Sequence, residues 1–168
     1  MSMPAPFDAA TRGGLLRRYA EGPDLLRRAW GQVPAEARTW RPGEGRWSAH
    51  EVVVHCADSE TYAATRIRLL LAEPEPLIVG YEEAEWARRF DYHASDPELA
   101  LHLVETVRAH TLALLRRLPD SAWGRMGRHT QSGPYGTDDW LRSYGAHLEV
   151  HAAQIDRTLA AWREGHGR

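Results

Sequence analysis

The 168-residue sequence contains no lysine, one cysteine and no long run of apolar residues. The single thiol, Cys56, excludes an internal disulfide and suits a reducing compartment. No apolar run is long enough to cross a bilayer as a helix, so we expect no membrane span. The first residues lack a charged segment followed by an apolar core, so we expect no signal peptide. These absences predict a cytoplasmic protein.

The charge balance also excludes a class of partners. Every basic side chain is an arginine, and the formal net charge is −2. That charge gives no electrostatic reason to expect binding to nucleic acid or to an anionic membrane. Hydrophobic residues make up 43% of the chain, which is ordinary for a globular protein with a proper core. At this length, one domain over residues 1–168 is the simplest expectation.

Four segments have the apolar periodicity of long helices: residues 7–31, about 49–72, 97–118, and from 137 onward. Gly22-Pro23 predicts a kink or a short break in the first. Ser48-Ala-His-Glu51 has the spacing of a capping box and predicts the start of the second. Asp96-Pro97 places an N-cap and an N1 proline at the start of the third, and Thr137 provides a cap for the fourth.

The connections between these segments differ in length. Residues 34–45 are rich in proline and glycine, and residues 120–136 carry enough glycine to predict a loop. Residues 75–95 form a longer connection, with a short helix expected around Glu82–Phe90. We find no strand pattern of any length. The sequence therefore predicts an all-α fold, a four-helix bundle with one long crossover connection.

Two histidines four residues apart, His147 and His151, lie inside the apolar stripe of the fourth predicted helix. A turn of about 100° per residue places Trp140, Tyr144 and Leu148 on the same stripe. Imidazoles directed toward a core must form hydrogen bonds or bind a metal ion, because burying an unsatisfied polar group is costly. The spacing allows both to contact one ion from adjacent turns, but core histidines satisfied by hydrogen bonds are the alternative.

Two segments together indicate a family. The stretch Arg46-Trp-Ser-Ala-His-Glu-Val-Val-Val-His-Cys-Ala-Asp-Ser-Glu60 resembles the start of the second helix in the DinB/YfiT-like family of candidate metal-dependent enzymes. Tyr144-x-x-His147-x-x-x-His151-x-x-Gln154-Ile155 is similar to the fourth-helix motif of that family. The resemblance implies that His55, His147 and His151 hold one divalent transition ion, which could be Zn²⁺, Ni²⁺, Mn²⁺ or Fe²⁺. It also fits the predicted order of helices over nearly the whole chain.

Three neutral imidazoles would leave open positions on the ion, as in a catalytic rather than a structural site. Characterised members of the family include thiol-dependent S-transferases and isomerases. The resemblance therefore implies a metal-dependent transferase that uses a low-molecular-weight thiol and a small-molecule substrate. A metal-dependent hydrolase and a non-catalytic metal-binding bundle stay open as alternatives, because a shared fold does not determine the reaction.

Other residues near these motifs have two interpretations each. Asp58 and Gln154 could each orient an imidazole from behind, but capping or solvation would explain them equally well. Tyr62 and Tyr144 could line a pocket, although aromatic packing in the core is the simpler expectation. Cys56 points about 100° away from His55 around the helix and is expected to be a small buried residue rather than a ligand.

The remaining histidines are expected to lie outside the metal site. His110 falls at the edge of an apolar stripe, and His129 lies in the glycine-rich segment, from which it could reach the pocket mouth. We expect the opening of the site near Trp47, His129 and Tyr135, which could act as gates. Apolar residues of the second helix away from His55, namely Val53, Val54 and Leu71, suggest a homodimer through an exposed helix face.

Overall fold

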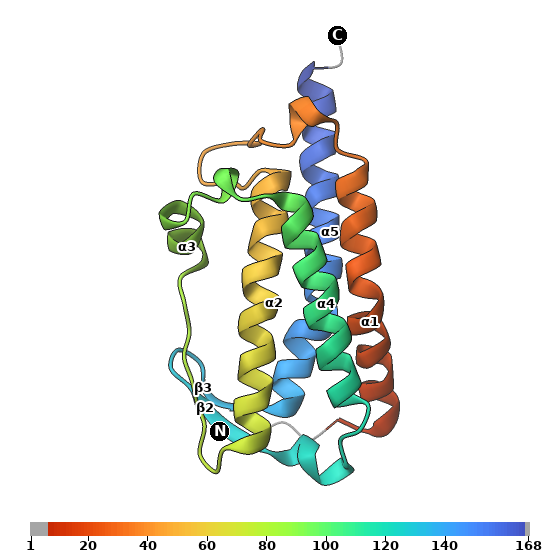
Figure 1. Ribbon diagram of the computed structural model, residues 1–168, viewed down its shortest axis with the longest axis vertical. Helices are drawn as coiled ribbons and strands as arrows, with labels where there is room; N and C mark the ends of the chain where they lie inside the picture. The colour runs from red at the N-terminus through yellow and green to blue at the C-terminus, as the bar shows by residue number, and fades with distance from the viewer. Residues whose placement is uncertain (1–6, 167–168) are drawn as a thin grey trace.

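The structure is a computed structural model, and it describes residues 7–166. Four long helices, α1 (Ala9–Gly31), α2 (Ala49–Ala72), α4 (Pro97–Leu115) and α5 (Thr137–His166), lie side by side (Figure 1). This arrangement confirms the predicted all-α four-helix bundle. Residues 1–6, from which we expected no signal peptide, lie outside the described range.

The helices have an uncommon order in space. α1 and α5 run in one direction along the bundle, and α2 and α4 run in the other (Figure 1). α2 packs against α4 and α5, and α1 packs against the same two helices, so α1 and α2 lie on a diagonal. Neighbours that point the same way cannot be joined by a short turn. The parallel pair α2 and α4 therefore requires the long connection over residues 73–96.

That connection runs back along the outside of α2 (Figure 1). It contains the strand β1 (Leu77–Ile78), the helix α3 (Glu83–Arg89) and a 3-10 turn, η2 (Tyr92–Ala94). The expected short helix is thus confirmed, with ends that differ by one residue. A further 3-10 turn, η1 (Ala35–Ala37), lies in the connection between α1 and α2.

The prediction that residues 120–136 form a loop, and that the chain has no strands, was wrong. The segment holds a 3-10 helix, η3 (Asp120–Gly124), and a hairpin of β2 (Met126–His129) and β3 (Gly133–Gly136). β2 also pairs in parallel with β1 of the crossover. Strands of two to four residues are too short to show an alternating pattern. At least one of the glycines is required by packing, since a Cβ on Gly127 would lie 2.6 Å from the carbonyl oxygen of Pro76.

A kink or a short break was predicted at Gly22-Pro23; α1 continues through Pro23, so the short break is absent. Proline has no N–H to donate to the carbonyl of Tyr19, four residues earlier. Arg108 of α4 donates to that carbonyl instead, with Nη1 2.7 Å from the oxygen. Gly22 leaves room for this group, because a Cβ there would lie 2.7 Å from the same nitrogen. The Gly22-Pro23 pair therefore provides a contact site for a buried arginine.

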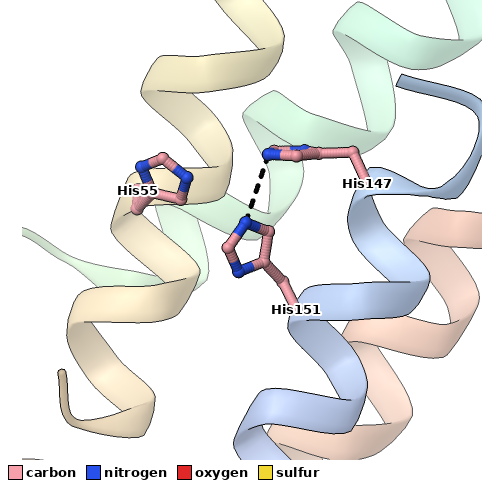
Figure 2. Close-up of side chains that lie close together, drawn as sticks. All are labelled: His55, His147 and His151. Atoms are coloured by element: carbon pink, nitrogen blue, oxygen red, sulfur yellow. Dashed lines mark hydrogen bonds between the residues drawn. The ribbon is translucent and has the colours of Figure 1, made fainter. Parts of the chain in front are cut away.

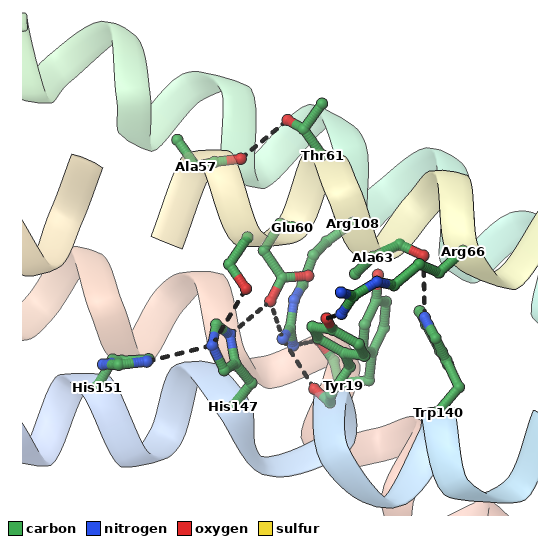
Figure 3. Close-up of polar contacts among 12 residues, drawn as sticks. Tyr19, Ala57, Glu60, Thr61, Ala63, Arg66, Arg108, Trp140, His147 and His151 are labelled. Carbon is green, nitrogen blue, oxygen red and sulfur yellow. Dashed lines mark hydrogen bonds and ion pairs between the residues drawn. The ribbon is translucent and has the colours of Figure 1, made fainter. Parts of the chain in front are cut away.

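The same guanidinium also reaches α2 and α5 (Figure 3). Its Nη2 lies 2.6 Å from Oε1 of Glu60 and 2.8 Å from the carbonyl oxygen of Tyr144. The side chains of Arg108 and Glu60 are almost completely buried, at 2% and 0% exposure. Groups from all four long helices thus meet at one ion pair in the interior.

α2 has buried residues at most of its positions. The predicted capping box is present, with the Ser48 hydroxyl accepting from the Glu51 N–H and the Glu51 carboxylate accepting from the Ser48 N–H. Val53 and Val54 are buried in the core, at 0% and 6% exposure, and Leu71 is half-buried. The face on which we based a homodimer is therefore not exposed, and dimerisation stays a prediction that needs another surface.

Within residues 7–166, no helix combines the length and the apolar character that crossing a bilayer requires. This agrees with the absence of a long apolar run in the sequence.

We expect Arg108→Met to lower the free energy of unfolding by about 3–5 kcal/mol, because it leaves the Glu60 carboxylate buried without its cation. The double variant Glu60→Gln with Arg108→Met should lose less than this, since neither charge then remains buried alone. Urea unfolding of both variants measures the difference. Arg117→Met, at an exposed position, is the matched control and should stay near wild type. A double variant less stable than Arg108→Met would contradict the account of the ion pair.

Candidate metal centre

Three imidazoles from two helices converge between α2 and α5 (Figure 2). His55 projects from α2, and His147 and His151 project toward it from adjacent turns of α5. One nitrogen of each ring can be chosen so that all three lie within 4.8 Å of one another. The fold therefore brings together the three histidines that the sequence singled out, from positions more than 90 residues apart in the chain.

The three rings of the cluster differ in exposure. His55 is fully buried, whereas His147 and His151 are half-buried. Burial, together with the neighbouring His151 and His147, lowers the pKa of His55 to about 2. Burial and the neighbouring His147 lower the pKa of His151 to about 4. Both rings are thus neutral at pH 7, which is the form that binds a metal ion.

Two acceptors fix the orientation of the rings on α5. Nδ1 of His147 lies 3.0 Å from Oε1 of Glu60, and Nδ1 of His151 lies 2.9 Å from Oε1 of Gln154. A carboxylate oxygen and an amide oxygen can only accept, so each Nδ1 carries the proton. Each Nε2 then presents a lone pair toward the cluster. Histidines that bind metal ions commonly have this arrangement, with the second ring nitrogen donating to a carboxylate or carbonyl.

The negative charge of Glu60 is stabilised by Arg108 and His147. Burial raises its pKa, but the Arg108 guanidinium and the hydrogen bond from His147 outweigh burial, so the net pKa is lowered from its usual value. An ionised carboxylate behind Nδ1 makes the imidazole of His147 a more basic ligand. The central ion pair therefore extends directly to the cluster (Figure 3).

The nitrogens of the cluster fit a cation. Nε2 of His147 and Nε2 of His151 lie 3.2 Å apart, although both present lone pairs in the tautomers set by Glu60 and Gln154. Within residues 7–166, neither nitrogen of His55 has a hydrogen-bond partner. Buried polar atoms without a partner are costly. One divalent ion bound by three imidazoles would satisfy these atoms, and this donor set is typical of catalytic zinc and related sites.

Tyr144 lies one turn before His147, with their ring centroids 5.5 Å apart. Burial raises the pKa of Tyr144, and the charge of Arg66 opposes this only in part, so the phenol keeps its proton at neutral pH. Nη1 of Arg66 donates to the phenol oxygen at 2.9 Å. Since that oxygen already accepts, the phenol proton can be donated to another group. Ser59 adds a second hydroxyl, 3.4 Å from Nε2 of His147.

Two other candidates from the sequence have their partners elsewhere. Asp58 accepts a hydrogen bond from the hydroxyl of Tyr92 at 2.7 Å, which ties α2 to the crossover. Tyr62 packs against Tyr81 and Trp86, with centroids 5.2 and 5.8 Å away. Of the two residues that we expected could orient an imidazole, Gln154 therefore does so and Asp58 does not.

The three residues expected at the opening of the site lie in two different places. Trp47 packs on His55, with ring centroids 4.7 Å apart. His129 instead stabilises the hairpin turn, where its Nδ1 accepts from the N–H of Gln131 at 3.2 Å. Tyr135 packs beside His129 at 5.4 Å. Of these three residues, Trp47 is the one with a contact to the cluster.

The side chains of His110 and Cys56 also point to structural roles. His110 is exposed, and its Nδ1 lies 3.3 Å from Nη2 of Arg68. Cys56 is fully buried, and burial raises its pKa well above the usual value. Neither residue is placed as a ligand, in agreement with the sequence-based expectation.

Sequence reasoning did not identify Glu60 or Arg108. Both are charged residues on otherwise apolar faces of predicted bundle helices: Glu60 lies four residues after Cys56, and Arg108 four residues after Val104. A charge in such a position needs a partner, so the pair could have been inferred as mutual counter-ions.

Comparison with known proteins identifies the family and supports the fold. Residues 18–155 match the family described as the DinB superfamily. A candidate metal-dependent hydrolase of Oceanobacillus iheyensis is 33% identical over 111 residues, which cover 66% of this chain and 64% of that protein. The match thus spans less than two thirds of that relative.

Two solved structures extend the comparison. YfiT from Bacillus subtilis, described as a metal-dependent hydrolase candidate with an unusual four-helix bundle topology, has a TM-score of 0.87 at 25% identity. The alignment covers 98% of this chain and 94% of YfiT. A mycothiol-dependent maleylpyruvate isomerase has a TM-score of 0.68 at 16% identity, covering 86% of this chain and 60% of the isomerase, and so shares the fold.

We expect the protein to bind one divalent transition ion per chain, and His→Ala at position 55, 147 or 151 to weaken that binding severely. Metal content after dialysis, measured by mass spectrometry, tests this expectation. His129→Ala is the control, because its ring contacts the hairpin turn instead. Wild-type metal content in all three single variants would show that the site lies elsewhere.

Glu60→Gln should weaken metal binding by roughly 10–100-fold, because a neutral amide makes the His147 ring a poorer ligand than a carboxylate does. Competition with a chromogenic chelator measures the affinity. Gln154→Glu is the opposing variant at His151, where an added negative charge should tighten binding. Equal affinities in wild type and both variants would mean that these partners do not tune the ligands.

Proposed function

Because this chain belongs to the DinB superfamily and its histidine cluster fits a divalent ion, we propose that it is a metal-dependent transferase that joins a small thiol to an electrophilic substrate. The four-helix fold accommodates thiol-dependent chemistry in one protein of similar structure, the mycothiol-dependent isomerase. In the reaction proposed here the thiol loses its proton and sulfur bonds to the electrophilic carbon of the second substrate, while a carbon–oxygen bond at that carbon breaks and leaves its electron pair on the oxygen, which is then protonated.

One observation favours a thiol over water as the nucleophile. Two acidic side chains that follow His55 on α2 already have partners: Glu60 is paired with Arg108 and His147, and Asp58 accepts from Tyr92. Within residues 7–166, the cluster of metal-ligating side chains consists of three histidines without a carboxylate. When water attacks a substrate, a positioned base usually removes its proton. A thiol needs less help, because its proton is lost more easily.

A divalent ion in this site would lower the pKa of a bound thiol and hold it as thiolate at neutral pH. The protein groups then have separate tasks. Glu60 and Gln154 keep the Nδ1 protons of His147 and His151 in place, so that Nε2 faces the cluster. Tyr144 can donate its phenol proton to an oxygen of the electrophile, since Arg66 donates to the phenol oxygen. Cys56 is buried as a neutral thiol and is not the nucleophile.

The second candidate is a metal-dependent hydrolase. The description of the Oceanobacillus iheyensis relative and of YfiT as candidate hydrolases favours it. In that case a base other than Glu60 must accept the proton of water, because Glu60 is engaged in the buried ion pair. A cytoplasmic location would suit the thiol reaction, since the cytoplasm is reducing and keeps small thiols available. The native ion is proposed to be zinc, nickel, manganese or iron(II).

Titrating the Co²⁺-loaded protein with 2-mercaptoethanol should produce a thiolate-to-cobalt charge-transfer band in the near ultraviolet. The band should be lost in His147→Ala. It should persist in Cys56→Ala, which excludes the internal thiol as its source. A cobalt spectrum that no thiol alters, together with turnover of a simple ester, would overturn the transferase proposal in favour of the hydrolase.

A further inference from the structure

A cavity of about 530 Å³ lies beside the histidine cluster. Its walls come from the segment before α2, the first turn of α3 and the outer face of α5, so it is built where the crossover passes the bundle. Cavities of 300–1,000 Å³ are typical of sites for small organic molecules. The cavity is therefore large enough for a substrate or a substantial part of one.

The cavity shares two of its walls with the cluster. Trp47 lines it and packs on the ring of His55 at 4.7 Å. Gln154 lines it and accepts the Nδ1 proton of His151 at 2.9 Å. A molecule in the cavity would thus be separated from two of the three imidazoles by a single side chain. The three histidines do not line the cavity themselves, so a ligand with one end in the cavity would have to pass Trp47 or Gln154 to reach the cluster with its other end.

The charges around the cavity favour an anion. Arg46 and Arg157 both line it, and within residues 7–166 neither forms an ion pair with a carboxylate. Nearby arginines differ in this respect: Arg41 is paired with Glu51, and Arg88 with Glu85. The two unpaired guanidinium groups face a space that a ligand can enter.

Glu83, in the first turn of α3, adds one negative charge to the lining. The lining therefore has two positive groups against one negative group. Guanidinium groups bind carboxylates through paired hydrogen bonds with fixed geometry. An anionic ligand would be attracted by the two arginines and repelled by Glu83, so removing the arginines should weaken its binding and removing the charge of Glu83 should strengthen it.

We propose that this cavity binds the carboxylate end of the small thiol substrate, through Arg46 and Arg157, while its sulfur lies at the histidine cluster. The identity of the reacting end rests on the proposed function. The carboxylate site itself rests on the cavity, its two arginines and its contact with Trp47 and Gln154. The protein would accordingly prefer carboxylate-bearing thiols over neutral thiols of similar size.

Binding of two thiols to the Co²⁺-loaded protein tests this preference. Mercaptosuccinate carries two carboxylates, and 2-mercaptoethanol carries none. In the double variant Arg46→Gln with Arg157→Gln, the dissociation constant for mercaptosuccinate should rise roughly tenfold, because two charge-assisted contacts are lost at a partly exposed site. The constant for 2-mercaptoethanol should not change. Glu83→Gln should tighten mercaptosuccinate binding, and Arg163→Gln, outside the cavity, should leave both constants unchanged.

The outcomes separate this proposal from the proposed function. Succinate, which has no thiol, should bind the same protein in calorimetry and follow the same order: weaker in the double arginine variant and tighter in Glu83→Gln. If succinate shows this order while no thiol alters the cobalt spectrum, the carboxylate site stands and the thiol reaction fails. The carboxylate site is overturned if the arginine variant binds mercaptosuccinate as wild type does, or if it loses both thiols equally.

Discussion

The buried guanidinium of Arg108 is the group on which the arrangement of the bundle depends. It contacts the carbonyl of Tyr19 on α1, the carboxylate of Glu60 on α2 and the carbonyl of Tyr144 on α5. A charge in this position must be paired and hydrogen-bonded, because burial of an isolated cation is very costly. These contacts are satisfied in one packing of the four helices, so the ion pair helps to specify which helices are neighbours. Pro23 contributes by leaving a carbonyl of α1 without its helical partner.

The same interaction sets the chemistry of the cluster. Arg108 keeps Glu60 ionised, and Glu60 holds the proton of His147 on Nδ1. The lone pair on Nε2 then faces His151 and the buried ring of His55. One series of hydrogen bonds, from the Tyr19 carbonyl on α1 through Arg108 and Glu60 to His147 on α5, thus both stabilises the bundle and orients the His147 ring. A change at Arg108 would be felt at the imidazoles although the guanidinium contacts none of them in the described structure.

The long helices could be predicted from the sequence because their apolar periodicity and their caps agree, as at Ser48–Glu51. The three histidines could be found because two carry a helical spacing and the third lies in a segment that resembles a family. The small sheet could not be predicted, since β1 has two residues and pairs with residues 51 positions later in the chain. Asp58 and Gln154 each lie one turn from a histidine, so spacing alone could not show which of the two orients an imidazole. The partner of Asp58, Tyr92, comes from the crossover, whose path depends on the assembled fold.

Charged residues inside apolar stripes could have predicted a buried ion pair, which residue spacing alone does not. Glu60 and Arg108 are 48 positions apart, and nothing local connects them. The cost of burying either one alone implies that each has a partner, and in a four-helix bundle the partner must come from a facing helix. The unpaired Arg46 and Arg157 could not be distinguished in the same way, because an exposed arginine is ordinary until the cavity beside it is known.

X-ray absorption spectroscopy on protein purified without chelator or a nickel column shows directly whether three imidazoles bind a metal ion. We expect one bound ion whose inner shell contains three imidazole nitrogens, at about 2.0–2.1 Å if the ion is zinc, with the remaining positions held by light atoms. The imidazole signature should fall in His55→Ala, whose ring is fully buried in the cluster. A shell without imidazoles, or one with a protein sulfur at about 2.3 Å, would contradict the assignment of the three histidines.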